Sequence, residues 1–247
     1  MGRHPVATLL LGISGLAAFP AAAQTYGDTL AADVAGRHPA IISLRIDATG
    51  KDGKPLTLHG SGAGATATVP LTNALGEPIG SVTIVTRRRA AAAPIARELA
   101  RRIYVADNLA EPDPFVTGTV RSLRAQALVD TIIDRFPDLV TLAMHVALPG
   151  ADNTIIASNF GRVGKRADGD DADVIASGSI RKEVTNGGKR LAVELPMLDA
   201  RGTVIGALST SFAMASSADE ARAYTRAFAV RDALARMTPS LAALASK

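Results

Sequence analysis

Residues 127–144 read ALVDTIIDRFPDLVTLAM, and this stretch has a counterpart at residues 29–46, which read TLAADVAGRHPAIISLRI. The two segments agree at their apolar positions and share a proline after an amphipathic part. This pattern predicts a helix before the proline and a strand after it. The matched pairs are Leu30 with Leu128, Val34 with Ile132, Arg37 with Arg135 and Pro39 with Pro137.

A second match closes each copy of this pattern. Residues 69–84 read VPLTNALGEPIGSVTI and align with residues 195–210, which read LPMLDARGTVIGALST. A glycine in the middle of each segment suits a tight turn between two strands, because glycine readily adopts a positive φ. The repeat therefore predicts two tandem units, each an antiparallel sheet with flanking helices, in an α+β fold. The aligned pairs are Pro70 with Pro196, Gly76 with Gly202 and Gly80 with Gly206.

The start of the chain predicts export. Arg3 precedes the apolar run VATLLLGISGLAAF, and the small residues PAAAQ follow it. This order is typical of a secretory signal peptide cut after Ala23, although the run could also stay as an anchor. No later segment has the roughly 18 to 20 apolar residues that a spanning helix needs. We therefore expect a leader at 1–23, a first unit with a linker helix at 24–110, a second unit at 111–247, and a periplasmic or secreted location.

Composition excludes several kinds of site. The chain has no cysteine, so disulfides, thiolate nucleophiles and cysteine zinc sites are all absent. Its formal charge of +4 is a mild excess, and the most basic stretch, residues 86–102, suits a solvated helix face. Aromatic residues make up 4% of the chain. Export and so few rings to stack on bases argue against nucleic acid as a partner.

The second unit is longer than the first. The aligned prolines stand at positions 39 and 70 in the first unit and at 137 and 196 in the second. Much of the added chain is TIIASNFGRVGKRADGDDADVIASG, residues 154–178, which changes from a strand-like run to glycines and charges. We expect residues 159–185 to form a helical or loop lid over the second sheet, and the first unit to have no lid.

Alternation along residues 139–148 divides the strand after Pro137 into two faces. One face is wholly apolar and suits packing against a helix. The other face is small and mildly polar, which under a lid would leave space and offer hydrogen bonds. The resulting hypothesis is a ligand site formed by Thr141, Ala143 and His145 on the strand and by Asn159, Arg162 and Lys165 on the lid.

The cations of this site would suit an anionic or carboxylate-bearing ligand. In the alternative interpretation, Arg162 and Lys165 are solvated and pair loosely with the neighbouring aspartates. His145 could equally be an ordinary hydrogen-bonded core histidine.

These features together resemble the Cache and PAS-like family of extracytoplasmic sensory domains. The resemblance rests on the amphipathic helix before FPDLVTLAMHVA, on the charged insertion between the second and third strands, and on LPMLDARGTVIGAL. It implies small-molecule sensing in a pocket between sheet and lid. Because no transmembrane or cytoplasmic output segment is found, it also implies a membrane or periplasmic signalling partner. The tyrosine, arginine and tryptophan cluster of the amino-acid-binding members is not found, so the resemblance names no ligand.

Catalytic motifs are missing from the sequence. The chain after Ala23 has three histidines, His38, His59 and His145, without an HExxH pair or a GxSxG elbow. We therefore predict no enzymatic activity, metal or cofactor. One alternative is a protein-interaction module whose long helices pair chains, and a homodimer fits either function. A less favoured alternative is an exported hydrolase, which would need a serine within hydrogen-bond reach of His145.

Overall fold

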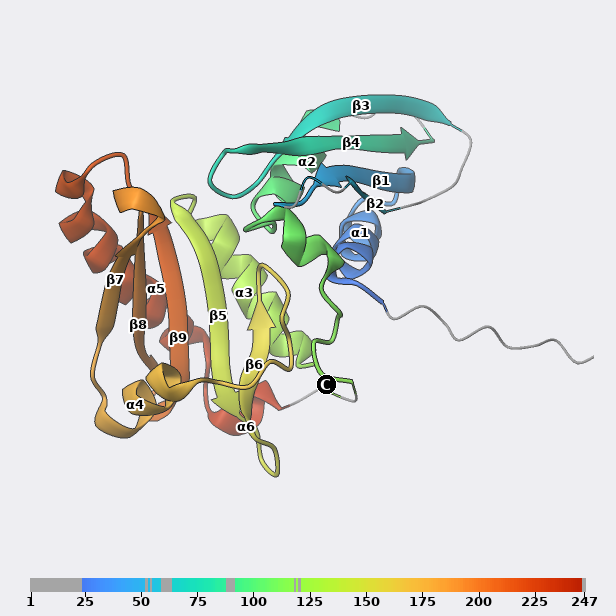
Figure 1. Ribbon diagram of the computed structural model, residues 1–247. Coiled ribbons are helices and arrows are strands. Elements are labelled where there is room, and N and C mark those ends of the chain that lie inside the picture. The colour runs from blue at the N-terminus through green and yellow to red at the C-terminus, as the bar shows by residue number, and fades with distance from the viewer. Residues whose placement is uncertain are drawn as a thin grey trace, which may run out of the picture.

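The computed structural model describes residues 24–245, apart from positions 52, 54, 59–63, 88–91, 118 and 120. Within these residues the chain forms two antiparallel sheets with helices packed on them, which confirms the predicted α+β class. Figure 1 shows the two sheets next to each other. None of the described helices has both the length and the apolarity needed to cross a membrane. The predicted leader at 1–23 lies outside the described residues.

The first sheet has four strands in the order β2-β1-β4-β3. Apolar side chains of α1 and α2 form a core against one of its faces. The opposite face carries Arg45 and Asp47, which pair at 2.8 Å and keep contact with solvent. The elements of this unit are α1 (Tyr26–Arg37), β1 (Ile41–Thr49), β2 (Pro55–Leu58), β3 (Ala65–Thr72), β4 (Pro78–Thr86), α2 (Ala92–Ala100) and the 3-10 helix η1 (Ala106–Ala110).

The second sheet has five strands in the order β6-β5-β9-β8-β7. Helices α3, α5 and α6 cover one face and share a core with every second residue of β5 and β8. The helix α4 lies on the opposite face, over β8 and β9 (Figure 1). The helices are α3 (Leu123–Arg135), α4 (Gly169–Ser177), η2 (Asn186–Gly188), η3 (Ser217–Asp219), α5 (Glu220–Met237) and α6 (Leu241–Leu244). The strands are β5 (Leu139–Ala147), β6 (Asn153–Ser158), β7 (Arg181–Thr185), β8 (Arg190–Leu198) and β9 (Val204–Ala213).

The two sheets share one strand order. In each sheet the first strand of the unit (β1 or β5) lies between the second strand (β2 or β6) and the last strand (β4 or β9). The last strand in turn lies beside the strand that precedes it in the chain, β3 or β8. The second sheet adds β7 at its edge. The glycines aligned in the sequence take equivalent places, because Gly80 approaches the main chain of Asp47 and Gly206 approaches that of His145. The sequence repeat is thus also a repeat in topology.

The closing hairpins of the two units are built alike. Gly76 and Gly202 have φ values of 79° and 82°, as the turn pattern predicts. In each turn an earlier side chain, Asn73 or Asp199, accepts hydrogen bonds from the main-chain N–H groups two and four residues later. These bonds satisfy the turn internally.

The charged insertion has three parts. Residues 163–167 turn back along β6, where the N–H of Ile155 donates to the carbonyl of Lys165 at 2.9 Å. The helix α4 then crosses the face of the sheet, and β7 joins its edge beside β8. Only α4 therefore lies over the sheet in the manner expected of a lid.

A polar joint connects the two units. The hydroxyl oxygen of Tyr26 on α1 lies 2.7 Å from the carbonyl oxygen of Arg102 and 3.0 Å from that of Asn159. Arg37 of the first unit also pairs with Glu98 at 2.7 Å and with Asp130 of α3 at 3.4 Å. These contacts tie α1 of the first unit to the loop after β6 and to α3 of the second unit.

Candidate functional site

The face of the second sheet under α4 carries polar side chains from four strands. Thr141, Ala143 and His145 do share this face, since the alternate positions of β5 point into the helix-covered core. Strand pairing sets Ser209 opposite both Ala143 and Glu194, and it sets Arg181 opposite Glu194. We call this surface the polar face. It comprises Thr141, Ala143, His145, Arg181, Glu183, Ala192, Glu194, Ser209 and Ser211.

Helix α4 begins at a capping box in the aspartate run. Asp168 accepts hydrogen bonds from the N–H groups of Asp170 and Asp171, and Asp171 accepts one from the N–H of Asp168. The acidic first turn also complements the helix dipole. The helix ends at Gly178, whose φ of 68° is the left-handed conformation common at this position. The aspartates are therefore more than a solvated charge run, because two of them start the helix.

His145, Asp171 and Ser209 form a cluster between α4 and the sheet, in which His145 and Asp171 are buried and Ser209 is half-buried. His145 Nδ1 lies 2.9 Å from Asp171 Oδ2, and His145 Nε2 lies 3.2 Å from Ser209 Oγ. Burial on its own would raise the pKa of Asp171, but the hydrogen bond and charge of His145 outweigh it and hold that pKa below its ordinary value. The cluster thus attaches the lid helix to β5 and β9.

Replacing Asp171 with asparagine is expected to lower the stability of the protein by roughly 1 to 3 kcal/mol, because a charge-assisted contact with His145 is lost. A carboxylate with a lowered pKa in the folded state stabilises above its unfolded value of about 3.9, and this stabilisation is lost as pH falls through the folded pKa. The difference between wild type and Asp171→Asn in urea unfolding should therefore be full at pH 6 and disappear in acid. A difference that stays constant down to pH 2 would contradict this assignment.

The same cluster resembles a serine, histidine and aspartate arrangement but differs in geometry. As in a triad, the carboxylate lies at Nδ1 and the serine at Nε2 of the imidazole. Ser209 Oγ, however, also lies 3.5 Å from Asp171 Oδ1, so the serine contacts the carboxylate as well as the ring. Strand β9 is also paired on both sides, which engages its main-chain N–H groups in the sheet and leaves them unsuited to bind an oxyanion. The geometry favours a structural and binding role.

A groove of about 350 Å³ lies next to this cluster, between α4 and the strands β7 and β8. Arg181 pairs with Asp170 at 2.9 Å, and Lys182 pairs with Glu220 at 2.6 Å. Glu194 differs, because its Oε2 is buried and no described residue bonds to it. Burial, and then the nearby aspartates of α4, raise the pKa of Glu194. The lining residues are Asp170, Arg181, Lys182, Glu183, Ala192 and Glu194.

Three of the six predicted site residues lie away from this groove. Asn159 is buried in the joint, and Arg162 donates to both carboxylate oxygens of Glu111, at 2.7 Å and 2.9 Å. Lys165 is exposed on the segment that follows β6. Arg162 and Lys165 also do not pair with the aspartates of the insertion, which bond instead to His145 and Arg181. Ligand contacts from these three residues stay predictions that their positions do not favour.

The other three predicted residues lie on the same face of the sheet as the groove but do not line it. His145 joins the cluster with Asp171, while Ala143 is fully buried. Thr141 Oγ1 lies 2.5 Å from Ser211 Oγ, in a buried hydroxyl pair.

The sequence analysis missed Asp171, Glu194 and Ser209. The available signal was alternation in β8 and β9, which places Glu194 and Ser209 opposite the apolar positions of their strands.

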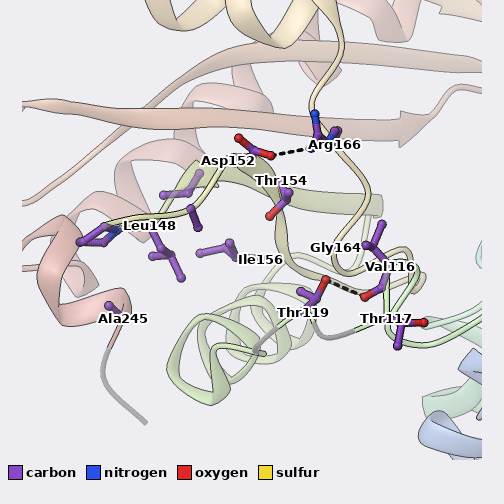
Figure 2. A pocket seen from close by; sticks show the side chains of 13 residues that line it. Val116, Thr117, Thr119, Leu148, Asp152, Thr154, Ile156, Gly164, Arg166 and Ala245 are labelled. Atoms are coloured by element: carbon purple, nitrogen blue, oxygen red, sulfur yellow. Dashed lines mark hydrogen bonds and ion pairs between the residues drawn. The ribbon is translucent and has the colours of Figure 1, made fainter.

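A larger recess of about 540 Å³ lies on the other side of the sheet, where β5 and β6 meet the end of α6 (Figure 2). Its walls are mostly apolar, with Leu148 and Ile156 among them. Three of its polar side chains already have partners, since Thr119 donates to the carbonyl of Val116 and Arg166 pairs with Asp152. Its lining residues Thr117, Thr119 and Ala245 are chain neighbours of positions outside the described residues. We therefore place the candidate site at the groove.

No metal site is evident, because the described residues contain no group of three or more histidines or carboxylates arranged to hold an ion.

Comparisons with known proteins found no matching family model, no similar curated protein and no similar solved structure.

Proposed function

We propose that this protein is an exported sensory module, related to Cache and PAS-like domains, that binds a small molecule in the groove beneath α4. The observation that carries the proposal is Glu194, whose buried oxygen has no partner among the described residues at the floor of that groove. A buried polar atom without a hydrogen bond is costly, and a bound ligand would supply one. The resulting signal would pass to a membrane or periplasmic protein.

The architecture supports this relationship. Each sheet follows the same strand order after a helix, and the second sheet has its insertion between its second and third strands, as the resemblance implies. The insertion supplies a helix over the sheet, while Arg45 and Asp47 of the first sheet keep contact with solvent. A pocket between sheet and lid is thus supported in the second unit alone.

The switching element in this proposal is α4. It is held to the sheet by the 2.9 Å contact of Asp171 with His145 and by the pairs of Asp170 and Asp173 with Arg181, at 2.9 Å and 3.7 Å. A ligand shifts a conformational equilibrium only if it binds one state more tightly than the other. A molecule that contacts both α4 and β8 meets this condition, since it favours the closed position of the helix.

The alternative function, a protein-interaction module, receives less support. It predicts an exposed apolar stripe on α3 or α5. The apolar residues of both helices instead face the core, and Leu123, at the start of α3, is the one large hydrophobic side chain on the described parts of these helices that is clearly exposed. Light scattering of the purified protein would show whether it forms a stable oligomer.

A thermal-shift screen tests the proposal. The purified protein is screened against organic acids, amino acids, purines and polyamines, together with Ala192→Phe, which fills the groove. A ligand at 100 times its dissociation constant should stabilise by about 2.7 kcal/mol and raise Tm by about 5 to 10 °C. The shift should persist in the control Thr66→Phe, which adds the same ring at an exposed site on β3. A panel without hits, or hits that survive Ala192→Phe, would refute the proposed site.

A further inference from the structure

We infer that the ligand of this groove carries a protonated amino group, and that Glu194 binds it. The inference rests on the proposed function, because it takes the groove as the binding site. It differs from the anionic ligand expected from Arg162 and Lys165, neither of which lines the groove. The argument depends on which charges in the groove already have partners.

The cations of the groove are neutralised by their neighbours. Arg181 bonds Asp170 and lies 3.7 Å from Asp173, so two carboxylates compensate one guanidinium. Lys182 pairs with Glu220 and lies over the ring of Tyr224, 5.6 Å from its centre. An anionic ligand would have to compete with these partners.

Two of the carboxylates that line the groove lack such compensation. Among the described residues, no cation forms an ion pair with Glu194 or with Glu183, although Arg181 stands opposite Glu194 in the strand register. Asp168, Asp170 and Asp171 add negative charge around Glu194. A negative ligand would be repelled by this set, whereas an ammonium group would relieve it.

Hydrogen bonding favours the same class of ligand. An ammonium group has three N–H donors and no acceptor. The groove offers acceptors in the carboxylates of Glu194 and Glu183. A charge-assisted bond to the buried Oε2 of Glu194 would satisfy the atom that has no partner among the described residues. A primary amine or diamine therefore fits the groove in both charge and hydrogen bonding.

The pH dependence of binding follows from the groups that face Glu194. Its raised pKa means that the carboxyl keeps its proton to a higher pH than an ordinary glutamate, and only the ionised form attracts an ammonium. Amine binding should therefore strengthen as pH rises through that pKa and release protons below it. The charged groups around Glu194 are Asp168, Asp170 and Asp171 on the α4 side, His145 on β5 and Arg181 on β7.

Titration calorimetry on the full chain purified after expression tests the inference with three probes of similar length: putrescine, succinate and 1,4-butanediol. We expect putrescine to bind and the other two not to. Glu194→Gln should weaken putrescine binding about tenfold to a hundredfold, and Glu183→Gln by less, since Glu183 is exposed. Asp152→Asn, a charge loss in the recess on the other side of the sheet, is the control and should leave affinity unchanged.

The possible results separate this inference from the proposed function. Unaltered Tm in Glu194→Gln would show that any lost binding is not lost folding. Succinate binding that requires Arg181, or a groove-dependent hit in the screen that carries no amine, would overturn the ligand class and leave the site intact. Absence of binding by putrescine and by other amines in the screen would also overturn the ligand class. Hits insensitive to Ala192→Phe would instead refute the site.

Discussion

Replacing Asn159 with alanine is expected to lower the free energy of unfolding by roughly 3 to 5 kcal/mol, the largest effect of any single substitution considered for this protein. The side chain is 1% exposed. Its Oδ1 accepts a hydrogen bond from the N–H of Leu142 at 2.7 Å, and its Nδ2 donates to the carbonyls of Arg101 and Val140, both at 2.9 Å. Alanine would leave these three main-chain groups buried without partners.

The three groups belong to both units, so the loss should also loosen the joint. Arg101 follows α2 in the first unit, whereas Val140 and Leu142 are in β5. We expect Tm to fall by about 10 °C and limited proteolysis to cut between the units. The control is Asn153→Ala on β6, whose Oδ1 has no hydrogen-bond partner in the described structure. Equal losses in the two variants would mean that the bonds of Asn159 are not the cause.

Replacing Gly206 with alanine is expected to destabilise the second sheet by about 3 kcal/mol. A Cβ at this position would overlap the carbonyl oxygen of His145 and lie 2.8 Å from Cγ2 of Val146. A main-chain carbonyl in a central strand pair cannot move aside as a flexible side chain can. The strands β5 and β9 would have to separate next to His145, so ligand binding in the groove should weaken together with stability.

Guanidinium unfolding of Gly206→Ala and of Gly202→Ala would measure this effect. Gly202 has a positive φ of 82°, but a Cβ there meets no atom within 4 Å. Its replacement should therefore cost only about 1 kcal/mol. The aligned Gly80 should behave like Gly206, because its Cβ would overlap the carbonyl of Asp47. If Gly202→Ala lowered the stability more than Gly206→Ala, the strain of a positive φ in the turn would be the main constraint at these glycines. The close approach of the neighbouring strand would then be the smaller one.

The local spacing of apolar and polar residues predicted much of the architecture. The amphipathic spacing before Pro39 and Pro137 corresponds to α1 and α3, and the alternation after Pro137 correctly separates the two faces of β5. These signals depend on residues a few positions apart, where helix and strand periodicity is directly visible in the chain. The repeat extended this information to the turns at Gly76 and Gly202.

The lid was predicted less accurately, for a reason that lies in its glycines. Gly161 and Gly164 have φ values of 83° and 93°, and Arg162 between them also adopts a positive φ of 66°. This left-handed stretch turns the chain back along β6 instead of across the sheet. Arg162 is thereby carried to Glu111, and Lys165 to the solvent. The charges of the segment alone did not indicate this reversal.

The sequence by itself determined the α+β class, the two repeated units, the positions of the main helices and strands, and the polar side of β5. Tertiary structure alone decided which side chains meet beneath α4. His145, Asp171, Glu194 and Ser209 come from three strands and a helix, and His145 and Ser209 are 64 positions apart. Strand order and the placement of α4 result from the summed burial of many apolar side chains, so no local pattern specifies them. The candidate site is consequently a property of the folded sheet.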